Sequence, residues 1–507
     1  MAMGLTERIQ AVMSVAPKQS ALEYKGHWHS WEEVSQLMQS LEVAAQKANL
    51  GEGEQIGVLL RNRPAHVAAL LQIIASRRCV VTLNPFQPPA KIAKELRELR
   101  LPLLVADEED LQQPAIQEAV EATGTQTLDV SSSDGKLTLT AIERQGSARD
   151  YAEPLPGTCV LMLTSGTTGP AKRIKLPYRN FERSLLDAAH YQSKKDGDRL
   201  EVKETPTILC TPLVHIGGMY ASMMSMISAR PLSILEKFSV DEWQNVVVKY
   251  RPKMVMLPPT ALRMILDAGV PREALSSLLA IRTGSSPLPP ELQDAFEETY
   301  GVPLLDVYGA TEFAGAVAGW TIKDHRRFKK EKRGSVGRAQ PGCELRIVDR
   351  ESGEPQPAGT VGLLEVKSVQ VDPTRWIRTN DLGELDEDGF LYIRGRADDA
   401  ITRGGFKVLP REVESVLREH PSVKEAAVVG LPDARLGAVP VAAVELYPEA
   451  KASADDLMGF VKEKLVKYQV PISITIMDSL PRTPSMKVSQ YELKDMLAKK
   501  NNVAPTA

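Results

Sequence analysis

The sequence predicts an α/β protein with three parts. These are a large N-terminal domain of mixed, largely parallel sheets and helices, a β-rich subdomain within it, and a small mobile α+β C-terminal domain. The chain has 507 residues, which is too long for one core, because single hydrophobic cores stop growing near about 250–300 residues. Apolar runs alternate with amphipathic stretches over most of the chain. From about Gly334 onward, short apolar runs are separated by Gly, Pro and Asp.

Four segments near the N-terminus follow the order strand, helix, strand, helix. They cover residues 55–60, 64–77, 79–84 and 89–99. Alternation at this spacing is typical of βαβ units and of sheets that are at least partly parallel. Further strands are expected at residues 159–164, 205–210, 254–259 and 279–284.

The later part of the chain predicts a more antiparallel arrangement. Short strands are expected at residues 337–349, 359–368 and 389–396, between turn-forming residues. A helix is expected at 410–420, because Pro410 suits a first helical position and the apolar residues that follow share one face. We therefore predict domains at residues 1–395 and 396–507, the second being of common domain size.

Composition excludes several classes of protein. Charged residues make up 25% of the chain and the net charge is −3, so no nucleic acid is expected as a partner. The four cysteines form no C-x-x-C pair, which favours a reducing, cytoplasmic setting. The N-terminus lacks the pattern of a signal peptide. Residues 205–229 carry no charge, but prolines, a histidine and a glycine pair interrupt them, so no transmembrane segment is expected.

The stretch "LTSGTTGPAK" at residues 163–172 combines hydroxyl and glycine residues directly after a predicted strand. Such a loop brings N–H and O–H donors toward an anion, and phosphate suits it. It lacks the spacing of a Walker loop. A flexible turn is the alternative for this composition.

Six segments occur in a fixed order and together resemble the adenylate-forming superfamily of acyl-CoA synthetases, adenylation domains and luciferases, in particular the acyl- and aryl-CoA synthetase branch. The resemblance covers most of the chain. The segments are "LTSGTTGPAK", "PLVHIGG" (212–218), "YGATE" (308–312), "GSVG" (334–337), "RTNDLGELDEDGFLYIRGRADD" (378–399) and "PRTPSMK" (481–487).

The resemblance implies an ATP-dependent carboxylic acid:CoA ligase. Such an enzyme forms an acyl-adenylate with release of pyrophosphate, and then an acyl-CoA thioester. ATP, Mg²⁺ and coenzyme A are the implied cofactors. The alternatives are a stand-alone adenylation protein that loads the pantetheine of a separate carrier protein, and a nucleotide-binding sensor without catalysis. The chain ends about twenty residues after Lys487, which favours free CoA, and a homodimer is compatible with these predictions.

The resemblance also implies which residues bind the nucleotide. Tyr308 would stack on adenine, Asp306 would accept from its amino group, and Asp381 would bind the ribose hydroxyls beside Arg396. Within the segment 378–399, Glu384 and Asp386 are the alternatives to Asp381. The implied phosphate, nucleotide and metal ligands further include Thr164, Ser165, Gly166, Thr167, Thr168, Gly169, Lys172, Gly284, Ser285, Ser286, Gly309, Thr311 and Glu312, with Glu312 and Thr168 on Mg²⁺.

Three further assignments by resemblance concern catalysis. Lys487 would neutralise the carboxylate and the α-phosphate during adenylation, although a lysine near the end of a chain is usually solvated. A hinge at Asp398 would then rotate the small domain. Gly404 and Gly405 would let a pantetheine arm pass close to the backbone.

His215 is expected beside the acyl carboxylate, and a hydrogen-bonded core histidine is the alternative. Relatives that activate amino acids commonly have an aspartate in this segment, which here is absent, so we expect an acid without an α-amino group. The basic stretch at 324–333 is expected to be a solvated loop, with CoA phosphates as the alternative ligand. Departures from the usual pattern fall at Ala171, Arg173, Tyr178, Asn380 and Met486.

Overall fold

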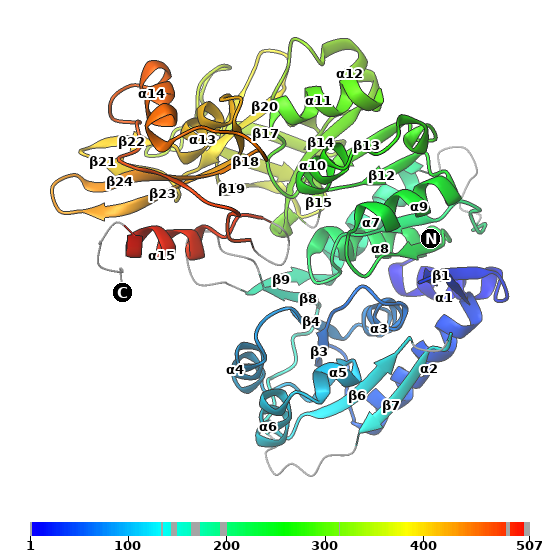
Figure 1. The fold of residues 1–507 in the computed structure, drawn as a ribbon. Helices are drawn as coiled ribbons and strands as arrows, with labels where there is room; N and C mark the ends of the chain where they lie inside the picture. Colours follow the sequence, from blue (N-terminus) through cyan, green and yellow to red (C-terminus); the bar gives the residue numbers. More distant parts are fainter. Residues whose placement is uncertain are drawn as a thin grey trace. The chain divides into compact units, whose positions relative to one another are not determined.

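The contacts divide the chain into two compact units, with the division between Ala316 and Val317. Each unit is built from sheets and covering helices, which can be followed in Figure 1. The predicted α/β architecture is confirmed. The computed structural model describes residues 3–132, 135–142, 150–163, 173–192, 200–313, 315–482 and 487–500.

A seven-stranded sheet forms the N-terminal part of the first unit, in the order β7-β6-β5-β3-β4-β8-β9. The five central strands run parallel, and β7 and β9 are antiparallel edges. This confirms the βαβ pattern expected from the sequence. The bounds are β3 Gln55–Leu59, β4 Cys79–Leu83, β5 Leu103–Ala106, β6 Gln126–Ser131, β7 Thr138–Ile142, β8 Thr158–Leu163 and β9 Arg173–Pro177.

Helices cover both faces of this sheet, which is why its central strands are apolar throughout. Ile56 and Val80 pack toward one core, and Leu59 and Val81 pack toward the other. The first core includes α1 (Leu5–Val15), α2 (Trp31–Lys47) and α3 (Pro64–Ala75). The second includes α4 (Pro89–Leu99), the short α5 (Glu108–Leu111) and α6 (Pro114–Thr123).

A four-stranded sheet, β10-β11-β1-β2, lies in the same unit. Two helices that matter for the site neighbour these strands in the sequence. Helix α7 follows β9 of the seven-stranded sheet and precedes β10, and α8 connects β10 to β11. The bounds are β1 Ser20–Tyr24, β2 His27–Ser30, β10 Thr207–Leu209, β11 Leu232–Ile234, α7 Tyr178–Gln192 and α8 Ile216–Ile227.

The third sheet contains the parallel strands β12, β13 and β14. One face of these strands carries Val255, Ile281 and Leu304, which join the core formed with α9, α10 and α11. The order continues through β15 to β16, and β15 contains the division between the units. The bounds are β12 Met254–Met256, β13 Ala280–Thr283, β14 Leu304–Ala310, β15 Gly315–Gly319, β16 Arg338–Ala339, α9 Val240–Tyr250, α10 Pro259–Asp267, η1 Arg272–Leu275, α11 Pro290–Tyr300 and η2 Thr311–Phe313.

The second unit begins with the predicted antiparallel region and ends with a mixed α+β region. Strands β17 to β20 form an antiparallel sheet. Strands β21 to β25 form a mixed sheet, in which β25 runs parallel to β24 and the other pairs are antiparallel. Helices α13 and α14 pack into one core on it and α15 into a second. The bounds are α12 Ile322–Phe328, β17 Cys343–Val348, β18 Gly362–Ser368, β19 Asp372–Leu385, β20 Leu391–Arg396, β21 Ile401–Arg403, β22 Phe406–Val408, α13 Pro410–Arg418, β23 Val423–Asp433, β24 Gly437–Leu446, α14 Ala454–Lys464, β25 Ile474–Ile476 and α15 Gln490–Lys500.

Two expectations about organisation have different outcomes. The predicted domain boundary at residue 396, and the mobility of the segment after it, stay predictions. The apolar stretch 205–229 contains β10 and the twelve-residue α8. Within the described part of the chain, no helix is both long and apolar enough to span a bilayer.

Candidate active site

The residues predicted to grip the β- and γ-phosphates lie outside the described residues, and so does Met486. The strands on either side of the phosphate segment are described: β8 ends at Leu163, which pairs with Arg173, the first residue of β9. The undescribed residues with a predicted role are Thr164, Ser165, Gly166, Thr167, Thr168, Gly169 and Lys172.

Two departures from the family pattern have a structural reason. Arg173 donates to the Thr82 carbonyl oxygen at 3.0 Å and to the Glu95 carboxylate at 2.7 Å. Tyr178 is buried, and its hydroxyl lies 3.0 Å from that of Thr6. These contacts lie at the start of β9 and at the start of α7.

The predicted nucleotide residues cluster at the carboxyl ends of β13 and β14. Gly284, Ser285 and Ser286 directly follow β13, and Asp306, Tyr308 and Gly309 belong to β14. Asp306 is 6% exposed and pairs in register with Thr283. In parallel sheets, ligands bind at this end of the strands. The structure thus brings together the residues that the sequence assigned to the adenine end of ATP.

A close approach of two strands explains the glycine of "YGATE". A Cβ atom at Gly309 would lie 2.3 Å from the Gly315 carbonyl oxygen, a separation that no larger residue tolerates. Glu312 follows on η2 and is exposed. The side chain of Thr311 lies outside the description. The tight packing at Gly309 therefore lies three residues before the exposed carboxylate of Glu312.

The donors present fit Mg²⁺ in the form in which nucleotide enzymes hold it. Mg²⁺ in such sites takes one or two carboxylates and completes its shell with phosphate oxygens and water. Glu312 offers one exposed carboxylate. No group of three or more His, Cys, Asp or Glu side chains within the described ranges could form an all-protein cage. Thr168, the second predicted ligand, falls in the undescribed segment.

His215 is the N-cap residue of α8, and Asn62 holds the loop that leads to it. The Asn62 amide nitrogen donates to the carbonyl oxygens of Thr211 at 3.2 Å and Leu235 at 3.1 Å. Its carbonyl oxygen accepts from the backbone N–H of Leu213 at 2.8 Å. Asn62 is only 3% exposed. One side chain therefore ties the ends of β10 and β11 to the start of α8.

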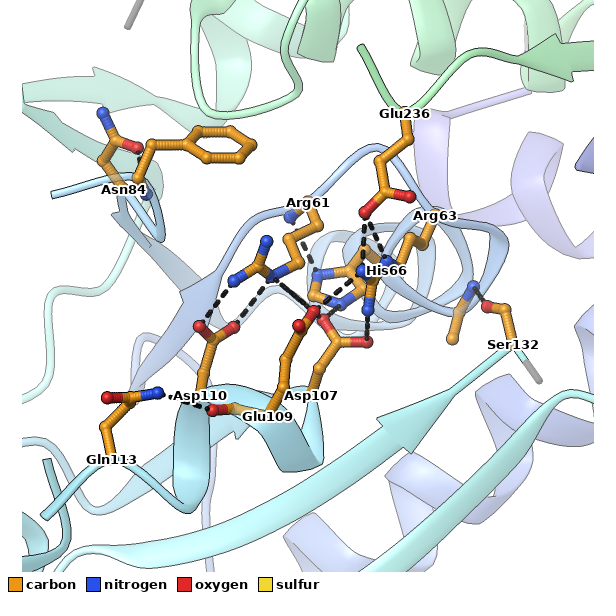
Figure 2. Close-up of polar contacts among 12 residues, drawn as sticks. Arg61, Arg63, His66, Asn84, Asp107, Glu109, Asp110, Gln113, Ser132 and Glu236 are labelled. Carbon is orange, nitrogen blue, oxygen red and sulfur yellow. Dashed lines mark hydrogen bonds and ion pairs between the residues drawn. The ribbon is translucent and has the colours of Figure 1, made fainter. Parts of the chain in front are cut away.

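The charged side chains next to Asn62 form a cluster that we call the paired cluster (Figure 2). Arg63 donates to Asp107 at 2.8 Å and contacts Glu236 at 2.5 Å. Arg61 donates twice to Asp110, at 2.9 and 2.7 Å. The cluster consists of Arg61, Arg63, His66, Asp107, Glu109, Asp110 and Glu236.

Histidine completes the paired cluster in a defined tautomer. His66 is fully buried, and its Nδ1 accepts from the backbone N–H of Arg61 at 3.3 Å. Its Nε2 therefore carries the proton and donates to Asp107 at 2.7 Å. Burial alone would lower the pKa of Arg63, but the charge of Asp107 and the hydrogen bond to Glu236 raise it overall. Each cation in this cluster has a carboxylate partner within the fold.

The predicted ribose residues lie together in the second unit. Asp381 on β19 pairs in register with Arg396 on β20, and the Arg396 guanidinium is 3.9 Å from the Asp381 carboxylate. Arg396 also donates to both carboxylate oxygens of Asp398, at 3.0 and 3.1 Å. The predicted hinge residue is therefore bonded to the predicted ribose site.

Asp399, beside the predicted hinge, is electrostatically strained. Burial, followed by the charge of Asp398, raises the pKa of Asp399 to about 6. The two other acids that were alternatives to Asp381 have partners nearby. Glu384 accepts from Arg394 at 2.6 Å, and Asp386 pairs with Lys332 at 2.9 Å.

Gly404 and Gly405 form the two-residue turn between β21 and β22. Their φ angles are +57° and +89°, which only glycine adopts without strain at two successive positions. Arg403 donates to the carbonyl oxygens of Tyr468 and Val470, at 3.0 and 2.8 Å. The turn is therefore a defined hairpin without side chains at its tip.

Lys487 lies half-buried near Arg411, the second residue of α13. Burial, and then the positive charge of Arg411, lower the pKa of Lys487. Burial also lowers the pKa of Arg411, against the charges of Glu414 and Asp381. No ion pair to Lys487 is formed by the described residues. Two cations thus lie together. Glu414, Asp381 and Asp399 act on Arg411, whereas no carboxylate among the described residues raises the pKa of Lys487.

Most of the basic stretch at 324–333 belongs to helix α12 and the turn that follows it. Lys332 contacts Asp388 at 2.5 Å as well as Asp386, and Asp324 lies 3.4 Å from Arg338. Several of these charges are therefore matched within the fold. A role for the stretch in holding CoA phosphates stays untested.

The site residues divide between the two units. Gly284, Asp306, Tyr308, Glu312 and His215 belong to the first, and the second holds Asp381, Arg396, Gly404, Gly405 and Lys487. Two residues that sequence reasoning missed are Asn62 and Arg411. No local signal identifies them, because an Asn after a strand and an Arg in the first turn of a helix are ordinary at such positions.

Comparison with protein families gives two matches that together span most of the chain. A model described as AMP-binding enzyme matches residues 9–373. A model described as AMP-binding enzyme C-terminal domain matches residues 412–487.

Curated relatives and solved structures are similar over nearly the whole length. The chain is 30% identical over 504 residues to the 2-succinylbenzoate–CoA ligase of Bacillus pumilus (strain SAFR-032), covering 95% of this chain and 96% of the relative. It is 29% identical over 469 residues to the sulfoacetate–CoA ligase of Cupriavidus necator, covering 88% of each.

The fold is similar to two solved enzymes. One is the o-succinylbenzoate CoA synthetase of Bacillus subtilis in complex with its acyl-adenylate intermediate, with a TM-score of 0.78, 26% identity, and 96% and 98% of the two chains covered. The other is ATP-bound MatB of Rhodopseudomonas palustris, with a TM-score of 0.81, 23% identity, and 98% and 99% covered.

Proposed function

The chain belongs to the AMP-binding enzyme family, and from this premise we propose how its residues serve an AMP-forming ligase that joins a carboxylic acid to coenzyme A. CoA ligases that are similar over nearly the full length support this activity. One observation carries the residue assignment. The chain has Glu312, Asp381 and Lys487, which a non-catalytic relative is expected to lose, and Lys487 lies where the fold leaves its charge unmatched.

In the first half-reaction, a carboxylate oxygen of the acid attacks the α-phosphorus of ATP. The α-phosphorus–oxygen bond breaks and pyrophosphate leaves. Because the nucleophile comes from the substrate, the protein contributes positioning and charge stabilisation. We assign Lys487 to the negative charge on the carboxylate and the α-phosphate. Because Lys487 has no ion-pair partner among the described residues, no ion pair within the fold has to break when it binds that negative charge.

The adenosine end of ATP is assigned to residues of β14 and of the β19–β20 pair. Tyr308 stacks on adenine, and Asp306 accepts from its amino group. Asp381 accepts from the ribose hydroxyls, and the Arg396 guanidinium lies 3.9 Å from its carboxylate. Glu312 holds Mg²⁺, which when bound neutralises charge on the phosphate oxygens.

In the second half-reaction, the CoA thiol attacks the acyl carbonyl carbon and AMP leaves. The glycine turn at Gly404 and Gly405 presents backbone without side chains, so a pantetheine arm can pass close to it. We assign the change between the two half-reactions to a hinge at Asp398. Rotation about this hinge would move the proposed domain 396–507. The bonds from Arg396 to Asp398 give the hinge a defined resting state.

The acid is proposed to lack an α-amino group, because no aspartate or glutamate occurs in residues 212–218 to pair with an ammonium. His215 lies at the start of α8, where a helix favours negative charge, and so suits the reacting carboxylate. We place the protein in the cytoplasm, where its cysteines stay reduced, and all four are free in the structure. A homodimer stays a prediction.

The test is an acid-dependent assay with and without CoA. A panel of fatty, aromatic and polycyclic acids is incubated with ATP and Mg²⁺, and pyrophosphate and thioester are measured. We expect pyrophosphate release with some acids and thioester only when CoA is present. Adenylation without transfer to CoA would support carrier-protein loading instead, and no release from any acid would support a sensor.

A further inference from the structure

Arg282 lies on β13, the strand between β12 and β14, and its side chain points away from the core of that sheet. Its neighbours in sequence, Ile281 and Thr283, are fully buried, whereas Arg282 is exposed. Its register partner on β12 is Met256. Paired residues of neighbouring strands share a face, and Met254 and Met256 on that face are 41% and 36% exposed.

Three other elements reach the neighbourhood of Arg282. Tyr220 on α8 is close enough for the charge of Arg282 to affect its pKa. The Tyr220 hydroxyl donates to the Ser184 carbonyl oxygen on α7 at 3.1 Å. A Cβ atom at Gly315, the first residue of β15, would lie 3.3 Å from the Ser184 hydroxyl and 3.9 Å from the Tyr220 ring. Tyr220, which the charge of Arg282 affects, is therefore packed between α7 and β15.

The charge of Arg282 has no counter-charge in the described chain. Burial lowers the pKa of Arg282, which means that the surrounding protein removes water from the guanidinium although part of it stays exposed. Tyr220 is not an anionic partner, because burial raises its pKa and keeps the phenol neutral near pH 7. Asp187 on α7 lies 3.8 Å from Arg183. No carboxylate among the described residues pairs with Arg282.

We propose that Arg282 binds a second anionic group of the acid substrate, which is therefore a dicarboxylic acid or a carboxylic acid that also bears a sulfonate. This rests on the proposed function, in which His215 lies by the reacting carboxylate. His215 and Tyr220 are at the start and in the second turn of α8, and five residues of helix rise about 7.5 Å. The two charges of the acid are thus separated by a ring or by several methylene groups.

The chemistry of this face matches such a substrate. A guanidinium offers paired N–H donors that fit a carboxylate or sulfonate in two parallel hydrogen bonds. Met254 and Met256 provide flexible apolar surface beside it, against which a spacer can pack. A desolvated cation that is unmatched in the free protein also rejects acids that leave it unmatched when they bind.

The experiment compares matched acids on the intact enzyme. Each diacid of a series, both aliphatic and benzene-dicarboxylic, is paired with its monomethyl ester, which keeps the reacting carboxylate and removes the second charge. Adding the corresponding sulfonated acids separates the two sources of the anion. Pyrophosphate release gives kcat/KM for each. We expect at least one diacid or sulfonated acid to exceed its uncharged partner by roughly 10- to 100-fold.

Three variants place this preference on Arg282. Arg282→Met should remove the preference for the charged acid and leave kcat/KM for the monoester within about threefold. Arg282→Lys should retain part of the preference, because charge remains and the paired donors are lost. Arg282→Glu should disfavour the diacid further. A circular dichroism melting curve for each variant confirms that it is folded.

The outcomes separate this proposal from the proposed function. Pyrophosphate release with monoesters equal to or above that with diacids overturns the role of Arg282 and leaves the ligase activity intact. An equal fall for both acids of a pair in a folded Arg282→Met variant also overturns it. No acid-dependent release from any member of either series contradicts the proposed function itself.

Discussion

Two groups of basic side chains differ in whether the fold supplies their counter-charges. In the paired cluster, Arg61 and Arg63 each contact carboxylates at 2.5–2.9 Å (Figure 2). Lys487 and Arg411 lie near each other, and burial lowers the pKa of both. The first group lies beside the loop that supports His215, and the second contains Lys487, which we assign to the phosphate charge. We infer that cations with carboxylate partners stabilise the fold, whereas a cation without such a partner is available to bind the substrate.

The same distinction has an energetic side. Breaking a partly buried ion pair leaves an uncompensated charge, which costs several kcal/mol. Removing a desolvated cation that has no partner costs the fold nothing of that kind and relieves the penalty of burying the charge. Stability and activity should therefore respond in opposite ways to substitutions in the two groups.

The largest expected effect on stability is at Arg63. Arg63→Ala leaves Asp107 and Glu236 without their closest cation, so we expect the free energy of unfolding to fall by about 3 kcal/mol. The urea midpoint measures this. Arg394→Ala is the matched control, because Arg394 forms an exposed pair with Glu384 and should cost less than about 1 kcal/mol. Equal midpoints for the two variants would remove the distinction for the paired cluster.

A smaller effect is expected at Asn62, which links the scaffold to the site. Asn62→Ala leaves a buried N–H and two carbonyl oxygens without partners, at a cost of about 1–3 kcal/mol. Because the affected loop leads to His215, KM for the acid should rise more than KM for ATP. Asn62→Asp keeps the acceptor for the Leu213 N–H and should recover part of the acid affinity. Parallel changes in both KM values would indicate a purely structural role.

The smallest effect is a pH dependence at Asp399. Its pKa is raised to about 6 in the folded protein, above about 3.9 for an unperturbed aspartate. The folded state therefore binds the proton more tightly, and stability from this group is lost as pH rises through about 4 to 6.

The Asp399→Asn variant should not show this fall in the free energy of unfolding as the pH rises. It should unfold at higher urea than the wild type at pH 8, and the difference should vanish near pH 4. Asp398→Asn is the comparison variant. It keeps an acceptor for one of the two hydrogen bonds from Arg396 and removes the charge that raises the pKa of Asp399, so the pH dependence should weaken but not vanish. A constant difference across pH would contradict the assignment to Asp399.

The regular elements could be predicted from the sequence because their signals are local. The apolar run of β3 and the Pro64 that starts α3 lie within a few residues of the structure they specify. Asp306 and Tyr308 could be assigned to adenine only through the resemblance carried by the "YGATE" motif, which is also a local signal. The contacts of Asn62 could not, because its partners are 149 to 173 residues away. The unmatched charges of Lys487 and Arg282 likewise depend on burial and on the lack of a carboxylate partner among the described residues, which no local pattern records.

Lys487, a cation without a carboxylate partner among the described residues, should contribute to adenylation and not to the stability of the fold. The Lys487→Ala variant measures both contributions. Three quantities are measured on one preparation: adenylation rate, thioester formation from supplied acyl-adenylate, and the urea midpoint. We expect the adenylation rate to fall by roughly 10²- to 10³-fold, thioester formation to be spared, and the urea midpoint to stay equal or rise. A lower midpoint with an equal loss of both half-reactions would contradict this expectation.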